Sequence, residues 1–255
     1  IRLLESGSFD PARHSGRVTL LPQDAQLPRE ARVAELMHFY AELQGVPWPD
    51  IADGVKRLLR TVHLEDRANS AVRTLSHGMM RRLTIAQAFL GDPELVLLDE
   101  PLSGLDPREC QNARRFLEQR RPGQTVVISS HNLHDIERLC DRVAFVEKGR
   151  TVLQDSVDSV TGRSRVVQYH VVPGKFDLAG LQKSMAGAWL SLSDSEDVLT
   201  CRFSVPEHSL ESVNAVVLQR LMQAGVGIRR VQAGDGLEQA YLERTEPVVG
   251  RSVVK

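Results

Sequence analysis

Two adjacent carboxylates that follow a short apolar run are the chemically densest feature of the sequence. Residues 95–98 are all apolar, which predicts a strand buried inside a sheet, and Asp99 and Glu100 come directly after them. In open α/β sheets, ligands bind at the carboxyl ends of the strands. One acid at that edge can hold Mg²⁺ on a nucleotide, and a second can orient or deprotonate an attacking water. Taken alone, the pair fits a solvated acidic turn at least as well.

An anion-binding segment is expected upstream of the carboxylates. Ser76 and Gly78 lie at the start of a predicted helix that carries Arg81 and Arg82. The free backbone N–H groups of a helix N-terminus and the helix dipole favour a negative charge, and a glycine lets a phosphate approach closely. The alternative is that Ser76 is an ordinary N-cap without a ligand.

Three more polar residues complete the set of candidates. Gln23 follows one predicted strand and His131 follows another, so both should reach the edge that carries Glu100 if neighbouring parallel strands are in register. An amide at this edge can reach a metal or a water. Asp106 lies at the end of the Ser-Gly-Leu-Asp run that follows the two carboxylates.

The elements that position these residues alternate between short apolar strands and amphipathic helices up to about residue 152. Strands are expected at residues 18–21, 95–98, 125–128 and 142–147, and helices at 33–44, 50–59, 79–90, 108–120 and 133–139. Asp50 is the expected cap of the second helix. Continuous apolar strands separated by helices predict a parallel sheet that is buried on both faces.

A second, smaller unit is expected after about residue 164. The pattern predicts strands at residues 166–172, 189–192, 198–203 and 226–231, and helices at 178–185, 210–224 and 237–244. The first six of these elements follow the order β-α-β-β-α-β, which is typical of a ferredoxin-like α+β unit. With residues 158–163 as the linker, the predicted domains are 1–157 and 164–246.

Composition narrows the functional classes. The 255 residues carry 32 Lys and Arg against 33 Asp and Glu, a net charge of −1, which gives no support for broad binding to nucleic acid or anionic lipid. The three cysteines, Cys110, Cys140 and Cys201, are widely spaced and odd in number, as expected for reduced thiols in the cytoplasm. No apolar run approaches the ~20 residues of a membrane helix.

The motifs, in this order, resemble the ABC ATPase family over about residues 17–152. In the terms of that family, Gln23 matches the Q-loop, residues 75–79 the signature segment, 95–99 the Walker B strand, Glu100 the catalytic carboxylate, 103–106 the D-loop and His131 the switch histidine. Residues 236–245 also resemble the tail of exporter-type, single-cassette subunits.

The resemblance implies a P-loop NTPase-like α/β fold with a helical subdomain, in an ATPase subunit that powers a membrane permease from the cytoplasmic face of the membrane. It implies ATP and Mg²⁺ as cofactors and a second ATPase subunit as a partner, in a homo- or heterodimer, with no role for nucleic acid. The implied site residues are Glu100 and His131 for catalysis; Gln23, Ser76, Gly78, Asp99 and His131 for ATP; Gln23 and Asp99 for Mg²⁺; and Asp106 for coupling between subunits.

The sequence departs from the family pattern in two places. The family's phosphate-binding loop (Walker A) ends in Gly-Lys-Ser or Gly-Lys-Thr, and neither run occurs in the 255 residues, so the ATPase domain reads as truncated at its N-terminus. The chain by itself is therefore expected to have little or no ATPase activity. In the signature segment, His77 and Met79 stand where the family has glycine and glutamine.

Two alternatives to a transport ATPase stay open at this point. The first is a non-catalytic subunit that completes the ATP site of a partner in trans. The second is a non-transport relative, and it is disfavoured: a DNA-repair ATPase needs long coiled-coil insertions between Gln23 and Leu75, and a ribosome-acting factor needs two cassettes. Export is the expected direction of transport.

Overall fold

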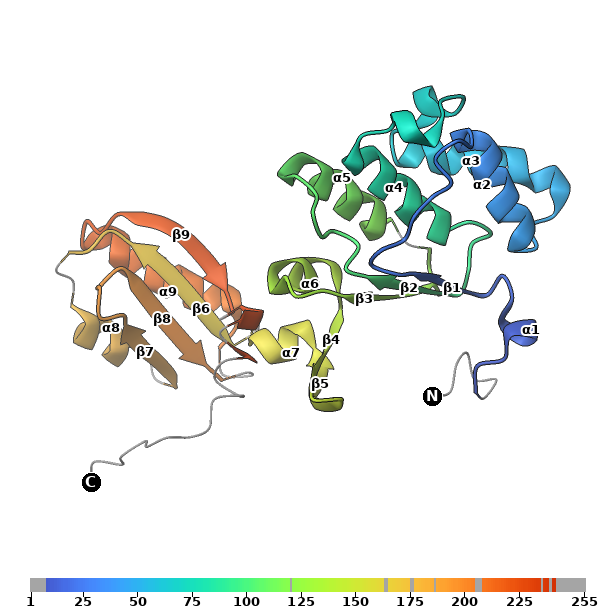
Figure 1. Ribbon diagram of the computed structural model, residues 1–255. Helices are drawn as coiled ribbons and strands as arrows, with labels where there is room; N and C mark the ends of the chain where they lie inside the picture. The colour runs from blue at the N-terminus through green and yellow to red at the C-terminus, as the bar shows by residue number, and fades with distance from the viewer. Residues whose placement is uncertain are drawn as a thin grey trace. The chain divides into compact units, whose positions relative to one another are not determined.

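The computed structural model describes residues 8–119, 121–162, 165–174, 177–185, 187–204, 208–234, 236–238 and 240–241. Internal contacts divide the chain into two compact units, residues 1–132 and 133–255 (Figure 1). This division lies upstream of the predicted linker, and residues within that linker are helical in α7 (Val157–Thr161). The proposed domain boundary at 157/164 therefore stays a prediction.

The first unit contains a three-stranded parallel sheet. Its strands are β1 (Val18–Leu21), β2 (Leu95–Asp99) and β3 (Thr125–Ser129), in the spatial order β1-β2-β3. The pairs Leu21–Leu98 and Asp99–Ser129 are in register. This confirms the predicted parallel sheet and aligns the carboxyl ends of its strands.

The helices of this unit lie before and between its strands along the chain. They are α1 (Pro11–His14), α2 (Val33–Leu43), α3 (Trp48–Thr61), α4 (His77–Ala88) and α5 (Pro107–Glu118), with 3₁₀ turns at Glu65–Arg67 and Val72–Thr74. The predicted cap of α3 at Asp50 is wrong: the N-cap is Pro47, and Asp50 lies inside the first turn. Pro49 also lies in that turn, where a proline is tolerated because its missing N–H would be unpaired anyway.

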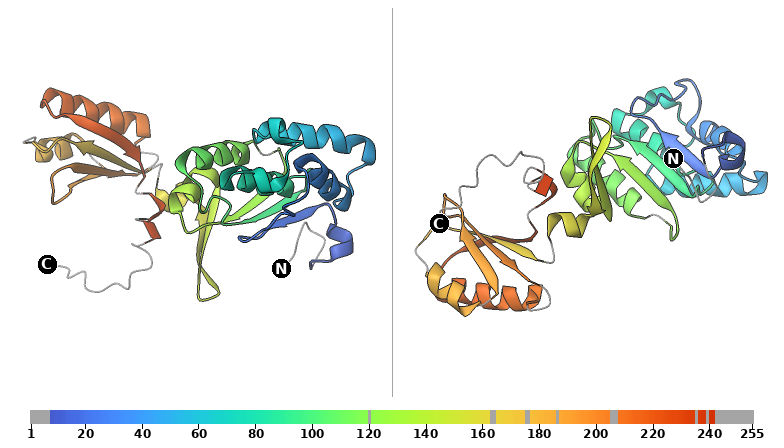
Figure 2. Two further views of the ribbon diagram at one scale, coloured as in Figure 1. Left: turned by 45° about the horizontal axis from the view of Figure 1, so that its top comes forward. Right: turned by 90° about the horizontal axis from the view of Figure 1, so that it is seen from below.

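Within the first unit, the longer helices cover one face of the parallel sheet. Helices α2, α3, α4 and α5 all lie on the same side of it in Figure 1 and in the left view of Figure 2. On the other face, Leu20 is 64% exposed and Val127 is 50% exposed. The predicted burial of both faces is therefore wrong for this part of the chain. A continuous apolar strand cannot by itself reveal whether a second layer is present.

The second unit begins with helix α6 (Leu133–Leu139) and the hairpin of β4 (Arg142–Glu147) and β5 (Arg150–Ser156). Strand β4 was expected, but it pairs antiparallel with β5 rather than joining the parallel sheet. The tight connection depends on Lys148 and Gly149, which both have positive φ angles of 50° and 76°, as two-residue hairpin turns require.

The ferredoxin-like part follows α7 and confirms the predicted order of elements. It consists of β6 (Val166–Val171), α8 (Leu178–Ser184), β7 (Ala188–Leu192), β8 (Val198–Phe203), α9 (Leu210–Gln223) and β9 (Ile228–Ala233). The antiparallel sheet has the order β7-β8-β6-β9. Half of the predicted helix at 237–244, namely residue 239 and residues 242–244, lies outside the described residues.

The core of this second unit forms between the sheet and its helices. Tyr169 and Cys201 from the strands pack with Val213, Val217 and Leu221 of α9, and all five are completely or almost completely buried. None of the helices within the described residues combines the length and the apolar character needed to cross a membrane.

Candidate functional site

Glu100 and His131 meet at the carboxyl edge of the parallel sheet. The carboxylate oxygen Oε1 of Glu100 accepts a hydrogen bond from the backbone N–H of His131 at 2.8 Å, and Nδ1 of His131 lies 2.8 Å from the same oxygen. The side chain of Glu100 is 17% exposed, whereas that of His131 is 78% exposed. The edge therefore presents a half-buried carboxylate beneath an imidazole that is open to solvent, and the two lie together as the sequence predicts.

Ser129 ties the two acidic residues to the neighbouring strand. Its hydroxyl donates a hydrogen bond to Oδ1 of Asp99, and the backbone N–H of Glu100 lies 3.1 Å from the carbonyl oxygen and 3.2 Å from the hydroxyl oxygen of Ser129. Ser129 was not among the site residues expected from the sequence. The available signal was a hydroxyl two residues before His131 on a strand expected to pair beside Asp99.

The signature segment and the D-loop each contain a helix cap. Ser76 caps α4, and its hydroxyl accepts a hydrogen bond from the N–H of Met79 at 3.2 Å. Asp106 caps α5, and its carboxylate accepts from the N–H of Glu109 at 2.9 Å. Ser76 and Asp106 are exposed, so both can meet a ligand or a partner. Within the described residues, no hydrogen bond or ion pair joins Ser76 or Asp106 to the group formed by Asp99, Glu100, Ser129 and His131.

The two arginines of α4 point inward rather than toward an anion at the helix N-terminus. Arg81 and Arg82 are 8% and 6% exposed. Arg82 makes an ion pair with Glu109 and donates to the carbonyl of Val62. The guanidinium of Arg81 binds backbone carbonyls behind the carboxyl edge. Burial lowers the pKa of Arg81, and nearby carboxylates, including Glu100, oppose that shift.

The oxygen donors at this edge are of the kind that Mg²⁺ prefers. The described residues hold no group of three or more His, Cys, Asp or Glu side chains that could bind a metal without other ligands. Mg²⁺ on a nucleotide needs only one or two carboxylates, because phosphates and waters supply the remaining oxygens. Asp99 is exposed at the strand end, and the exposed Gln23 follows the adjacent strand. These two residues are the ones that would hold the ion.

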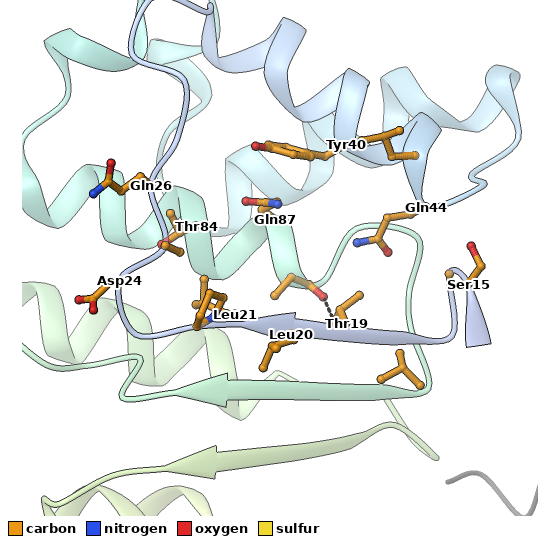
Figure 3. Close-up of a pocket in the computed structure, with 16 residues that line it drawn as sticks. Ser15, Thr19, Leu20, Leu21, Asp24, Gln26, Tyr40, Gln44, Thr84 and Gln87 are labelled. Atoms are coloured by element: carbon orange, nitrogen blue, oxygen red, sulfur yellow. Dashed lines mark hydrogen bonds between the residues drawn. The ribbon is translucent and has the colours of Figure 1, made fainter. Parts of the chain in front are cut away.

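A cavity of about 600 Å³ lies beside strand β1, next to the segment that contains Gln23. Figure 3 shows Asp24 and Gln26 on one side of it, Tyr40 and Gln44 on another, and Thr84 and Gln87 on α4. Helix α2 carries two exposed apolar side chains, Phe39 at 54% and Leu43 at 62%, and Leu43 lines the cavity.

Comparisons with known proteins agree with the geometry. The family model described as "ABC transporter" matches residues 5–103. The chain is 31% identical over 238 residues to "Nod factor export ATP-binding protein I" of Rhizobium etli, covering 89% of this chain and 69% of the relative. It is 34% identical over 176 residues to "Glucosylceramide transporter ABCA12" of Mus musculus, covering 68% of this chain and 7% of the relative.

A solved structure supports the same assignment. "Structure of ATP binding subunit of ABC transporter" superposes with a TM-score of 0.53 at 28% identity, over 60% of this chain and 64% of that one. The chain thus spans only 7% of the mouse transporter and less than two thirds of the solved subunit. The ordered motifs, the parallel sheet that gathers them at one edge and these similarities establish that the chain belongs to the ABC transporter family of ATP-binding proteins.

Proposed function

We propose that this chain is the ATP-binding and ATP-hydrolysing subunit of an ABC transporter of the export type. The observation that carries the proposal is the contact between Glu100 and His131 at the carboxyl edge of the sheet, one residue beyond Asp99. A carboxylate fixed next to an imidazole can orient a water and accept its proton while a neighbouring acid serves the metal. ATP, Mg²⁺ and a second ATPase subunit belong to this proposal.

Each residue of the edge has a separate task in this reaction. The carboxylate of Glu100 orients the attacking water and accepts its proton. The backbone N–H and Nδ1 of His131 both lie against one oxygen of that carboxylate, and Nε2 of the exposed ring contacts the terminal phosphate. Asp99 and Gln23 would hold Mg²⁺, which would supply charge neutralisation on the phosphates. Ser76 and Gly78 contact the nucleotide held by the partner subunit, and Asp106 couples the two sites.

The membrane partner is proposed to dock beside β1. The cavity next to Gln23, together with the exposed apolar side chain of Leu43 that lines it, offers a region for a segment of a permease. An apolar surface next to the Q-loop would let the permease influence Gln23. This docking places the subunit at the cytoplasmic face of the membrane as a peripheral protein.

ATP hydrolysis by the full natural gene product tests the proposal. Glu100→Gln should lower kcat by about 10²-fold or more, because a positioned acid–base group contributes that much, while binding of Mg-ATP stays intact. Glu94→Gln is the matched control: Glu94 lies just before β2, at the opposite end of the strand, where it pairs with Arg17. It should leave kcat unchanged. Full activity of Glu100→Gln would contradict the proposal.

The docking region is tested separately with the permease present. Leu43→Asp should reduce the stimulation of ATP hydrolysis by the permease and leave the basal rate unchanged. Val152→Asp, at a 48%-exposed position of β5, is the control for adding a charge to an exposed apolar site. Equal stimulation of the natural protein and of Leu43→Asp would place the permease elsewhere.

A further inference from the structure

Arg81 binds four backbone carbonyls from two different segments of the carboxyl edge. Its Nε donates to the carbonyl of Pro101 at 2.9 Å, and one terminal nitrogen donates to the carbonyl of Gln23 at 3.0 Å. The other terminal nitrogen lies 2.6 Å from the carbonyl of Glu100 and 3.4 Å from that of Asp99. One side chain on α4 thus joins the loop after β1 to the turn after β2.

The chemistry of arginine suits this task. The guanidinium is planar, stays charged and presents five N–H donors in a fixed fork, so it can hold several acceptors in one plane at once. The side chain is 8% exposed, and a buried charge is tolerated only where it is well hydrogen-bonded. The four carbonyls provide these hydrogen bonds, and the guanidinium in return fixes the backbone positions of Gln23 and Glu100.

The backbone of Glu100 needs such support. Its φ angle is +45°, in the left-handed region that residues with a β-carbon rarely adopt. Its N–H is held by Ser129, and its carbonyl accepts from Ser103 N at 3.1 Å and from Arg81 at 2.6 Å. This conformation decides where the carboxylate points, because the side chain leaves the same α-carbon.

We propose that Arg81 is a positioning residue for Glu100, and that it couples the Glu100 turn to the Gln23 segment so that the two move together. The inference rests on the proposed ATPase function. It assigns to Arg81, in the interior of α4, a link between the Q-loop and the Walker B turn, on the same helix that Ser76 caps. A displacement of Gln23 by the permease would reach Glu100 through this guanidinium.

The test compares kcat and nucleotide affinity in the full natural gene product. Arg81→Met removes all four hydrogen bonds and should lower kcat on the order of 10²-fold, as expected when a reacting group is misplaced by about 1 Å. Affinity for ATP measured without Mg²⁺ should stay within about threefold, because the guanidinium faces backbone carbonyls rather than the nucleotide. Arg81→Lys keeps the charge but not the planar fork, so an intermediate loss of about tenfold is expected.

A double-mutant cycle separates positioning from general support of the fold. If Arg81 acts through Glu100, then Arg81→Met should cause little further loss of kcat in a Glu100→Gln background. Phe116→Leu is the control for stability: it weakens the edge-on contact with Phe89, whose centroid is 4.9 Å away, and it lies apart from the carbonyls that Arg81 binds. It should lower the melting temperature of the protein while kcat stays unchanged.

The outcomes distinguish the inference from the function on which it rests. Natural kcat in Arg81→Met, or an equal fold-loss in the natural and Glu100→Gln backgrounds, would overturn the positioning role while the ATPase function stands. If Arg81→Met does not fold, natural kcat in Arg81→Lys overturns it in the same way. Full hydrolysis by Glu100→Gln alone would instead overturn the proposed function, and the role of Arg81 with it.

Discussion

Replacing Gly78 with alanine probes how tightly the signature segment packs against α5. A β-carbon at Gly78 would lie 2.6 Å from Cγ and 2.9 Å from Cδ of Glu109. Glu109 is not free to swing away, because its Oε2 lies 2.7 Å from Nε of Arg82, and the two side chains are only 21% and 7% exposed. One added methyl group therefore displaces Glu109 and breaks or distorts a largely buried ion pair.

Two effects of opposite sign set the magnitude. Alanine is favoured over glycine inside a helix by about 1 kcal/mol. Breaking a buried ion pair by removing one partner costs roughly 3–5 kcal/mol. We take the lower end, because Glu109 is partly exposed and is displaced rather than removed. The net loss in the free energy of unfolding is then about 2 kcal/mol, which lowers the melting temperature by roughly 4–8 °C.

Thermal unfolding of four variants provides the assay. Gly78→Ala should be destabilising in the natural background but neutral or stabilising in Glu109→Ala, where the clashing atoms are absent. Gly54→Ala in α3 is the control: nothing lies within 4 Å of its added β-carbon, so it should stabilise by about 0.5–1 kcal/mol. Hydrogen exchange over α4 and α5 would localise the change. A stabilising Gly78→Ala, or an equal loss in both backgrounds, would refute the reasoning.

Two further predictions concern the second unit. Tyr169→Phe removes the hydroxyl that donates to Oδ1 of Asn214 at 2.7 Å, so it should lower the free energy of unfolding by about 1 kcal/mol in a denaturant titration; no change would contradict the role of that bond. Burial raises the pKa of Cys201 to about 11, so at pH 8 its thiolate fraction is roughly 10²-fold below that of an ordinary thiol with a pKa of about 8.5. Thiol labelling of Cys201 should therefore be slow until the protein unfolds, and rapid labelling of the folded protein would show that the residue is accessible.

The positions of polar residues directly after apolar runs were sufficient to predict the carboxyl edge, and the periodicity of apolar residues predicted most of the helices and strands. Parallel strands bring their carboxyl ends to one edge, so residues that directly follow apolar strands, such as Glu100 and His131, are gathered by topology alone. Strand and helix periodicities likewise predicted the β-α-β-β-α-β order of the ferredoxin-like part, because each element there has one buried face.

How that edge is held depends on contacts between residues far apart in the sequence. Every residue offers a carbonyl acceptor, so the sequence contains no signal for which four carbonyls Arg81 binds. The left-handed backbone of Glu100 depends on contacts from Ser129 and Arg81, which are distant in sequence. The exposure of the sheet face around Leu20 could not be predicted either, because a strand of apolar residues has the same sequence pattern whether one or both faces are covered. Sequence patterns specify local periodicity, whereas these features depend on which surfaces meet in space.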